Sequence, residues 1–121
     1  GQVPNFDAGS VEAAAAEAVR SGIAPAIMID ASHANSSKRP ENQPLVVADV
    51  AAQVAAGDRR IIGVMIESNL VAGRQDLVPG KPLVYGQSIT DGCIGWDTTV
   101  EVLEQLADAV AARRQRTAKV A

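Results

Sequence analysis

The sequence predicts an α/β protein built around a parallel β-sheet. Segments with helical apolar periodicity alternate with short apolar runs that are typical of strands, which is the pattern of successive βα units. Two of these runs, residues 26–30 and 61–66, are apolar at nearly every position, as in strands covered on both faces. Polar clusters follow the strands. The 121 residues are enough for one domain or part of one.

The first helix is predicted over residues 11–21, which are rich in alanine. Ser10 is a suitable N-cap because its hydroxyl can accept a hydrogen bond from a free backbone N–H of the first turn. Gly22 follows the last helical residue, and glycine is the usual residue at a helix C-terminus. The chain then enters the first predicted strand, residues 26–30.

The second helix and second strand follow a polar loop at residues 31–42. The helix is predicted from about residue 44 to 56, with Pro44 in its first turn and Gly57 after its end. The strand is predicted over residues 61–66. The apolar face of the helix is expected to consist of Leu45, Ala48, Ala52 and Ala55.

A long connection rich in glycine and proline occupies residues 69–87. Loops of this length in compact domains are often functional. Residues 83–86 are expected to be extended, and residues 88–90 are predicted to form a short third strand.

The last helix is predicted to start near Thr98. Thr98 and Glu101 have the T-x-x-E spacing of a capping box. Basic residues at the end of the helix suit the negative pole of its dipole. The predicted apolar stripe consists of Val100, Leu103, Leu106, Ala107 and Val110.

Composition excludes several classes of function. The net charge of −3 and the interspersed charges do not make a basic surface for nucleic acid, and an aromatic content of 2% leaves no stacking platform. No apolar stretch approaches the roughly 20 residues that span a bilayer. Cys93, the single cysteine, has no partner for an internal disulfide. We therefore expect a cytoplasmic protein with neither nucleic-acid nor membrane partners.

His33, Glu67 and Asp91 each stand at or just after the end of a predicted strand. In a βα barrel all such ends meet on one face, where active sites lie. One imidazole and two carboxylates suit a divalent transition metal. Each residue also has an ordinary interpretation: a hydrogen-bonded loop histidine, a solvated strand end and a turn residue before a glycine. The pattern alone does not decide between these interpretations.

Three longer strings narrow the choice: "MIDASHANSSK", "IIGVMIESNLVAGRQ" and "YGQSITDGCIGW". Together they closely resemble the last third of type I 3-deoxy-D-arabino-heptulosonate 7-phosphate (DAHP) synthases, and the resemblance extends over nearly the whole chain. The related 3-deoxy-octulosonate 8-phosphate synthases share the barrel and the chemistry, but the form S-H-A-N-S-S-K is that of DAHP synthases.

The resemblance implies a fold and a reaction. The family fold is a (β/α)8 barrel, so residues 1–121 are expected to be the C-terminal segment of a single barrel domain, carrying about three of its strands, with the N-terminal strands absent. The family condenses phosphoenolpyruvate with erythrose 4-phosphate to give DAHP and phosphate. This reaction is the first step of the shikimate pathway, which leads to the aromatic amino acids.

The resemblance also implies the site residues. His33, Glu67 and Asp91 match three of the four family ligands for a divalent metal (Mn, Fe, Co or Zn), and the fourth is a cysteine on an absent strand. His33 and Asp91 are expected to be catalytic, with Asp91 also touching substrate hydroxyls. Cys93 is expected to be a small packed residue near the site. None of the loop cations matches a family phosphate ligand; these cations are Lys38, Arg39, Arg74 and Lys81.

Two further readings stay open. Three parallel strands cannot close a barrel, so the chain is expected to be inactive alone and to be stable only as a homo-oligomer or beside a complementary N-terminal segment. That non-catalytic fragment is the first alternative. The second is a small independent metal-binding α/β domain, in which three ligands hold the ion with water in the fourth position.

Overall fold

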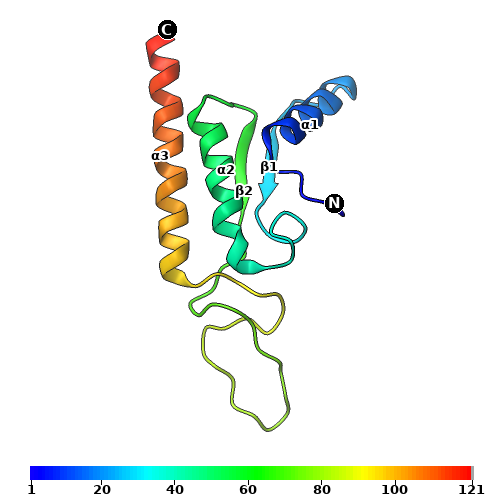
Figure 1. Ribbon diagram of the computed structural model, residues 1–121, viewed down its shortest axis with the longest axis vertical. Helices are drawn as coiled ribbons and strands as arrows, with labels where there is room; N and C mark the ends of the chain where they lie inside the picture. The colour runs from blue at the N-terminus through cyan, green and yellow to red at the C-terminus, as the bar shows by residue number, and fades with distance from the viewer. Residues whose placement is uncertain (121) are drawn as a thin grey trace.

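The computed structural model describes residues 1–120 as an α/β unit with a long loop at one end (Figure 1). No helix in this part of the chain combines the length and apolar character that crossing a membrane requires. The elements, in chain order, are α1 (Ala8–Arg20), β1 (Ile27–Asp30), the short 3-10 helix η1 (Pro40–Asn42), α2 (Gln43–Ala55), β2 (Ile61–Met65) and α3 (Trp96–Val120).

The sheet consists of β1 and β2, which pair in parallel with Ile27 opposite Ile61 and Asp30 opposite Met65. The predicted parallel sheet is therefore confirmed for these two strands. The third predicted strand, residues 88–90, is wrong for the described residues, where Ser88 forms only an isolated bridge with Arg74. So short a segment makes few ladder hydrogen bonds, and here it pairs with the long loop instead of β2. Residues 83–86 also lack strand structure.

Two helices begin earlier than the sequence predicted. Asp7, not Ser10, caps α1: its carboxylate accepts hydrogen bonds from the Ser10 N–H at 3.0 Å and the Ser10 hydroxyl at 2.7 Å. Helix α3 begins at Trp96, two residues before Thr98, because the Thr99 N–H donates to the Gly95 carbonyl at 3.0 Å and closes a turn. For α1, a carboxylate slightly upstream therefore caps the helix in place of the predicted Ser10 hydroxyl.

Helix α2 lies beside α3 (Figure 1), and its buried residues form a large part of the core. The face predicted for it was mostly wrong: Ala55 packs against the core as expected, but Leu45 is 70% exposed and Ala52 is exposed, while the valines of the helix are buried. The alanines bury less apolar area than the valines, so the valine face is the one that turns inward. The buried residues of α2 are Gln43, Val46, Val47, Val50, Ala51 and Val54.

The stripe predicted for α3 was partly wrong. Leu106 and Val110 pack against the core as expected. Val100, Leu103 and Ala107 are exposed, and the buried positions are instead Thr99, Val102 and Ala109. The buried face is the one that meets α2, and apolar size along α3 alone does not reveal which face that is.

One face of the sheet is uncovered by residues 1–120. Ile29 and Ile61 are buried on the helix side, whereas Met28 and Ile62 are 64% and 67% exposed. The Met28 side chain lies over Gly63, where an added Cβ would stand 3.5 Å from its atoms. Both faces of the strands are apolar, and among residues 1–120 only the helix side is covered, as expected for strands taken from an incomplete barrel.

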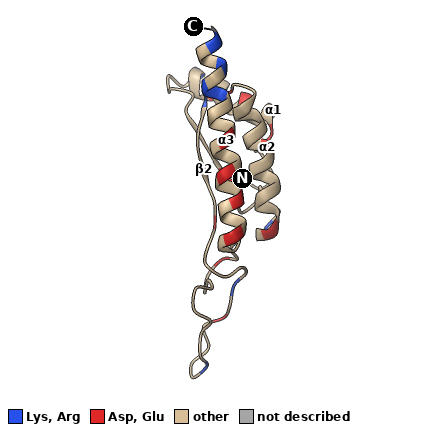
Figure 2. Cartoon of the chain, turned by 90° about the vertical axis from the view of Figure 1, so that its left-hand side faces the viewer, with Lys and Arg blue, Asp and Glu red and all other residues tan. Residues whose placement is uncertain are grey.

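Charge is graded along α3, with acidic residues over its first half and basic residues near its C-terminal end (Figure 2). Arg113 donates to the carbonyls of Asp58 and Ile61 at 2.8 and 2.9 Å, and Arg116 donates to the Ala55 carbonyl at 2.8 Å. These bonds tie the end of α3 to the turn before β2, and so hold the strand that leads to the candidate site.

Candidate metal centre

His33 lies in the tight loop that follows β1. Its φ of 52° is in the left-handed region, which is uncommon for a residue with a side chain. Neighbouring side chains brace this loop: the Asn35 amide donates to the Asp30 carbonyl at 2.7 Å, and the Ser36 hydroxyl donates to the His33 carbonyl at 3.2 Å. The backbone conformation of His33 is therefore fixed by its surroundings.

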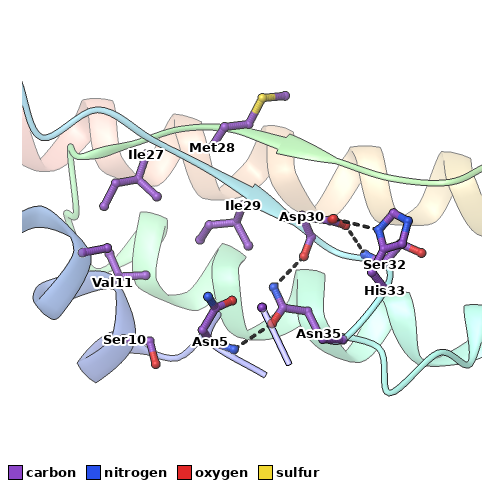
Figure 3. A pocket seen from close by; sticks show the side chains of 13 residues that line it. Asn5, Ser10, Val11, Ile27, Met28, Ile29, Asp30, Ser32, His33 and Asn35 are labelled. Carbon is purple, nitrogen blue, oxygen red and sulfur yellow. Dashed lines mark hydrogen bonds and ion pairs between the residues drawn. The ribbon is translucent and has the colours of Figure 1, made fainter. Parts of the chain in front are cut away.

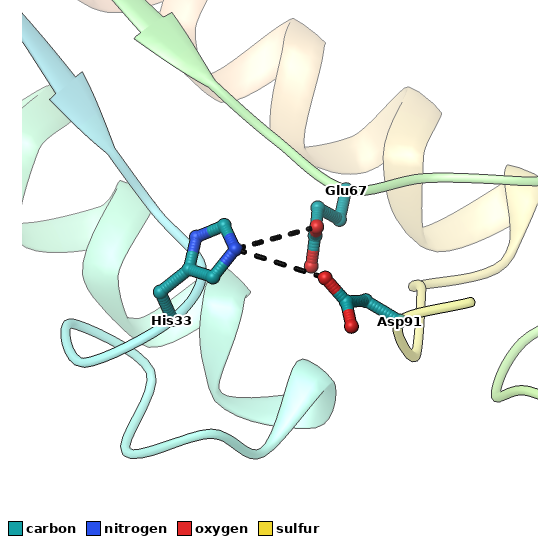
Figure 4. Close-up of side chains that lie close together, drawn as sticks. All are labelled: His33, Glu67 and Asp91. Atoms are coloured by element: carbon teal, nitrogen blue, oxygen red, sulfur yellow. Dashed lines mark ion pairs between the residues drawn. The ribbon is translucent and has the colours of Figure 1, made fainter.

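Asp30 orients the imidazole ring. Its Oδ2 lies 2.8 Å from Nδ1 of His33, and its Oδ1 accepts the Ser32 N–H at 2.7 Å. When Nδ1 carries the proton and donates it to this carboxylate, Nε2 keeps a free lone pair. Nε2 lies 3.7 Å from Oε1 of Glu67 and 3.8 Å from Oδ2 of Asp91 (Figure 4).

Glu67 follows the end of β2 and is the most buried of the three side chains, with 21% of its side chain exposed. Its Oε2 accepts a hydrogen bond from the Ser32 hydroxyl at 2.5 Å. Ser32 is itself buried. With Oε2 held in this way, Oε1 is the oxygen that faces His33.

Asp91 is on the segment that returns from the long loop, and its side chain is 70% exposed. Hydrogen bonds on both sides hold this segment: the Ile94 N–H donates to the Glu67 carbonyl at 3.0 Å, and the Cys93 and Gly73 backbones exchange bonds of 2.9 and 3.1 Å. Gly92 packs so closely on Pro40 that an added Cβ would stand 2.9 Å from its ring. The placement of Asp91 thus does not require a third strand.

The structure brings the three predicted residues together, with one ligand atom from each within 4.8 Å of the others. Ligand atoms that share a transition metal stand about 2.0–2.2 Å from it, so small movements would let all three reach one ion. An imidazole nitrogen with two carboxylate oxygens is also a suitable donor set for a first-row divalent cation. His33, Glu67 and Asp91 are therefore suitable ligands for a divalent metal ion.

A cavity of about 370 Å³ opens beside the three side chains. Lys38 and Arg74 lie on its wall, so both positive and negative groups line it. Arg74 also donates to the Thr90 carbonyl at 2.8 Å and pairs with Asp76. The cavity therefore offers room for a small polar ligand next to the candidate metal position.

A second cavity, of about 330 Å³, lies between α1 and β1 (Figure 3). Four successive residues of β1 line it, so it runs along the edge of β1 that faces away from β2. Asn35 closes one end and accepts the Asn5 N–H at 2.7 Å. The cavity marks a strand edge that no strand among residues 1–120 covers.

The charges around His33 raise its pKa above the ordinary value of 6.5, first through the hydrogen bond to Asp30 and then through the charges of Asp30, Glu67 and Asp91. Burial raises the pKa of the Cys93 thiol, which disfavours the thiolate that binds metals. Cys93 is outside the cluster of metal-type side chains found in the described residues.

Sequence reasoning found the three candidate ligands but assigned no roles to the residues that hold them. Asp30 and Ser32 lie inside the quoted string around His33, and their position next to a candidate ligand was the available signal. Gln43, which contacts Glu67 from α2, carried no local signal because its partner lies far along the chain.

The fold and the site are together those of an α/β protein that brings an imidazole and two carboxylates close to each other beside the carboxyl ends of two parallel strands. The model of the DAHP synthetase I family matches residues 1–104. The chain belongs to this family, which confirms the resemblance predicted from its sequence.

Comparison with individual proteins supports the same family. The chain is 54% identical over 114 residues to a phospho-2-dehydro-3-deoxyheptonate aldolase of Haemophilus influenzae, covering 94% of this chain and 32% of that protein. It is 52% identical to the Phe-sensitive enzyme of that name from Escherichia coli K12, covering 94% and 33%. A solved structure of the Francisella tularensis aldolase matches with a TM-score of 0.86 and 47% identity, covering 92% of this chain and 32% of that one. The chain spans about a third of the length of the curated relatives it matches.

Proposed function

We propose that this chain is the C-terminal segment of a DAHP synthase and supplies three of the metal ligands of its active site. The reaction is the condensation of phosphoenolpyruvate with erythrose 4-phosphate to DAHP and phosphate. The observation that carries the proposal is the convergence of His33, Glu67 and Asp91 in a member of this family.

The two-stranded sheet, with its uncovered edges and face, supports the proposal that this chain is part of a (β/α)8 barrel. The sheet of the described residues has two strands and hence two edges, and one of its faces exposes Met28 and Ile62. A closed barrel removes strand edges and fills its interior with layers of such side chains. His33 and Glu67 also follow the carboxyl ends of β1 and β2, the end of a barrel where active sites lie.

When bound, a divalent Mn, Fe, Co or Zn ion would polarise the aldehyde of the sugar phosphate as a Lewis acid. The residues of this chain would bind the ion and orient its ligand atoms. His33 presents Nε2 to the ion because Asp30 accepts a hydrogen bond from Nδ1. Glu67 presents Oε1 because Ser32 donates a hydrogen bond to Oε2. Asp91, the most exposed of the three, is placed to accept hydrogen bonds from substrate hydroxyls. A fourth ligand, a cysteine, belongs to the N-terminal part of the barrel.

The proposal includes a partner and a location. The chain works in the cytoplasm with a complementary N-terminal segment, or within a homo-oligomer, and alone it turns over no substrate. The uncovered face of Met28 and Ile62 favours one alternative, a non-catalytic fragment that persists only when another polypeptide covers this face. An independent metal-binding domain is a weaker alternative that the ligand cluster alone would support.

Complementation tests the proposal. The chain is expressed alone and together with the N-terminal two thirds of the Haemophilus influenzae relative, and DAHP and phosphate are measured with both substrates and Mn²⁺. We expect product only from the complemented pair, its loss on chelation, and its loss in Asp91→Asn. Asp97→Asn, an exposed change in the first turn of α3, is the matched control.

Three results would count against the proposal. Product from the chain alone would contradict the need for a complementary segment. A pair that assembles on a sizing column but forms no product would favour the non-catalytic fragment. A stable monomer that binds Mn²⁺ through His33 but does not bind the N-terminal segment would favour the independent metal-binding domain.

A further inference from the structure

Gln43 is the first residue of α2 and is completely buried. Both polar atoms of its side chain form hydrogen bonds with the backbone of one residue, Glu67. Its Nε2 donates to the Glu67 carbonyl at 2.9 Å, and its Oε1 accepts the Glu67 N–H at 2.8 Å. A buried amide that bonds both backbone groups of one distant residue fixes the position of that residue closely.

Glu67 lies where the sheet has ended. Strand β2 stops at Met65, whose carbonyl accepts the Ala31 N–H at 2.9 Å. Beyond that bond β1 turns away into the His33 loop. The Gln43 amide therefore gives Glu67 the donor and acceptor that the peptide group of a neighbouring strand would otherwise supply.

The Glu67 carbonyl has a second donor. The Ile94 N–H reaches it at 3.0 Å, three residues after Asp91 along the chain. Gln43 and Ile94 thus share one carbonyl oxygen, and this oxygen joins helix α2 to the segment that carries Asp91. A loosened Glu67 backbone would disturb two of the three candidate ligands.

We infer that Gln43 is a positioning residue of the metal centre: it holds the Glu67 backbone so that the carboxylate faces His33. The inference rests on the proposed function, because it assigns Gln43 a purpose only if a metal binds there. Outer residues that orient ligands typically change metal affinity by 10–100-fold when they are replaced. A residue that only stabilises the fold would change stability without changing the affinity of the folded protein.

The test measures Mn²⁺ binding to the chain assembled with the N-terminal two thirds of the Haemophilus influenzae relative, by electron paramagnetic resonance with Mn²⁺ alone as the probe, and thermal unfolding in parallel. Gln43→Met removes both hydrogen bonds while keeping the length of the side chain. Gln53→Met is the matched control on the same helix, because Gln53 also bonds a distant carbonyl, that of Phe6 at 2.8 Å. We expect Gln43→Met to weaken Mn²⁺ binding at least about tenfold. Gln53→Met should leave binding within about twofold, and the spectrum of bound Mn²⁺ should change only in Gln43→Met.

Two failures are distinguishable. If the pair that contains the unchanged chain assembles but binds no Mn²⁺, or Glu67→Ala binds it normally, the proposed function fails and the inference with it. If the unchanged chain binds Mn²⁺ through Glu67 but Gln43→Met binds as tightly as Gln53→Met, only the inference is overturned. Should Gln43→Met fail to fold, Gln43→Asn keeps the amide but shortens the side chain by one methylene, so that it no longer reaches the Glu67 backbone. Wild-type affinity and spectrum in that variant would overturn the inference equally.

Discussion

Oδ2 of Asp30 lies 2.8 Å from Nδ1 of His33, while Nε2 on the other side of the ring points toward Glu67 and Asp91. This geometry leads to the first prediction. Asp30→Asn keeps the size of the side chain but removes the negative charge that favours the proton on Nδ1. We expect Mn²⁺ affinity, measured by titration calorimetry, to fall about 10–100-fold.

Asp49→Asn is the matched control for Asp30→Asn, since Asp49 contacts Gln53 within α2 and none of the candidate ligands. Its Mn²⁺ affinity should equal that of the unchanged chain. Equal affinities in the two variants would show that Asp30 does not orient the ring.

The second prediction concerns pH. Because the pKa of His33 is raised above 6.5 in the folded chain, the protonated ring stabilises the metal-free fold. This contribution is fully present below the unfolded pKa and is lost as pH rises through the raised folded pKa. Mn²⁺ binding has the opposite sign, because the metal needs the neutral ring, and it should strengthen over the same interval.

His33 is the only histidine in the chain, so its ring signal in proton NMR reports the pKa directly. We expect a midpoint above 6.5 in the metal-free chain and a lower midpoint in Asp30→Asn, because the hydrogen bond to Asp30 is the largest cause of the shift. A midpoint at or below 6.5 in the unchanged chain would contradict the geometry described here.

The third prediction tests the buried face of α2. Val50 is completely buried, whereas Leu45 on the same helix is 70% exposed. Val50→Ala should lower the free energy of unfolding by about 2 kcal/mol, through lost apolar burial and a small cavity. Leu45→Ala removes more atoms but should change it by less than about 0.5 kcal/mol. Urea unfolding measures both, and a larger loss in Leu45→Ala would restore the face predicted from the sequence.

The fourth prediction concerns the long loop. Gly86 and Gly80 have almost the same φ, 79° and 80°, but an added Cβ at Gly86 would lie 2.8 Å from Cβ of Leu70, and at Gly80 it would meet nothing within 4 Å. Alanine at either position carries the left-handed backbone cost of roughly 1–2 kcal/mol. Gly86→Ala should lose more stability in thermal unfolding because it adds a clash, and equal losses would show that the loop relaxes around it.

The alternation of helices and strands, the family and the three candidate ligands were all predictable from the amino-acid sequence. Each of these features depends on residues that are close together in the sequence. Apolar runs indicate β1 and β2, and the strings around His33, Glu67 and Asp91 are long enough to identify the family. The expectation that strand ends meet also needed only the parallel order of the strands.

Features that depend on contacts between residues distant along the chain became visible only in the folded structure. Apolar content pointed to Leu45 for the core, but contact with the sheet and α3 selected the valine face of α2. Residues 88–90 met the long loop and not β2, so no third strand formed among the described residues. The role of Gln43 appeared only when folding brought it beside Glu67, because a hydrogen bond between residues from separate elements leaves no periodic mark in either one.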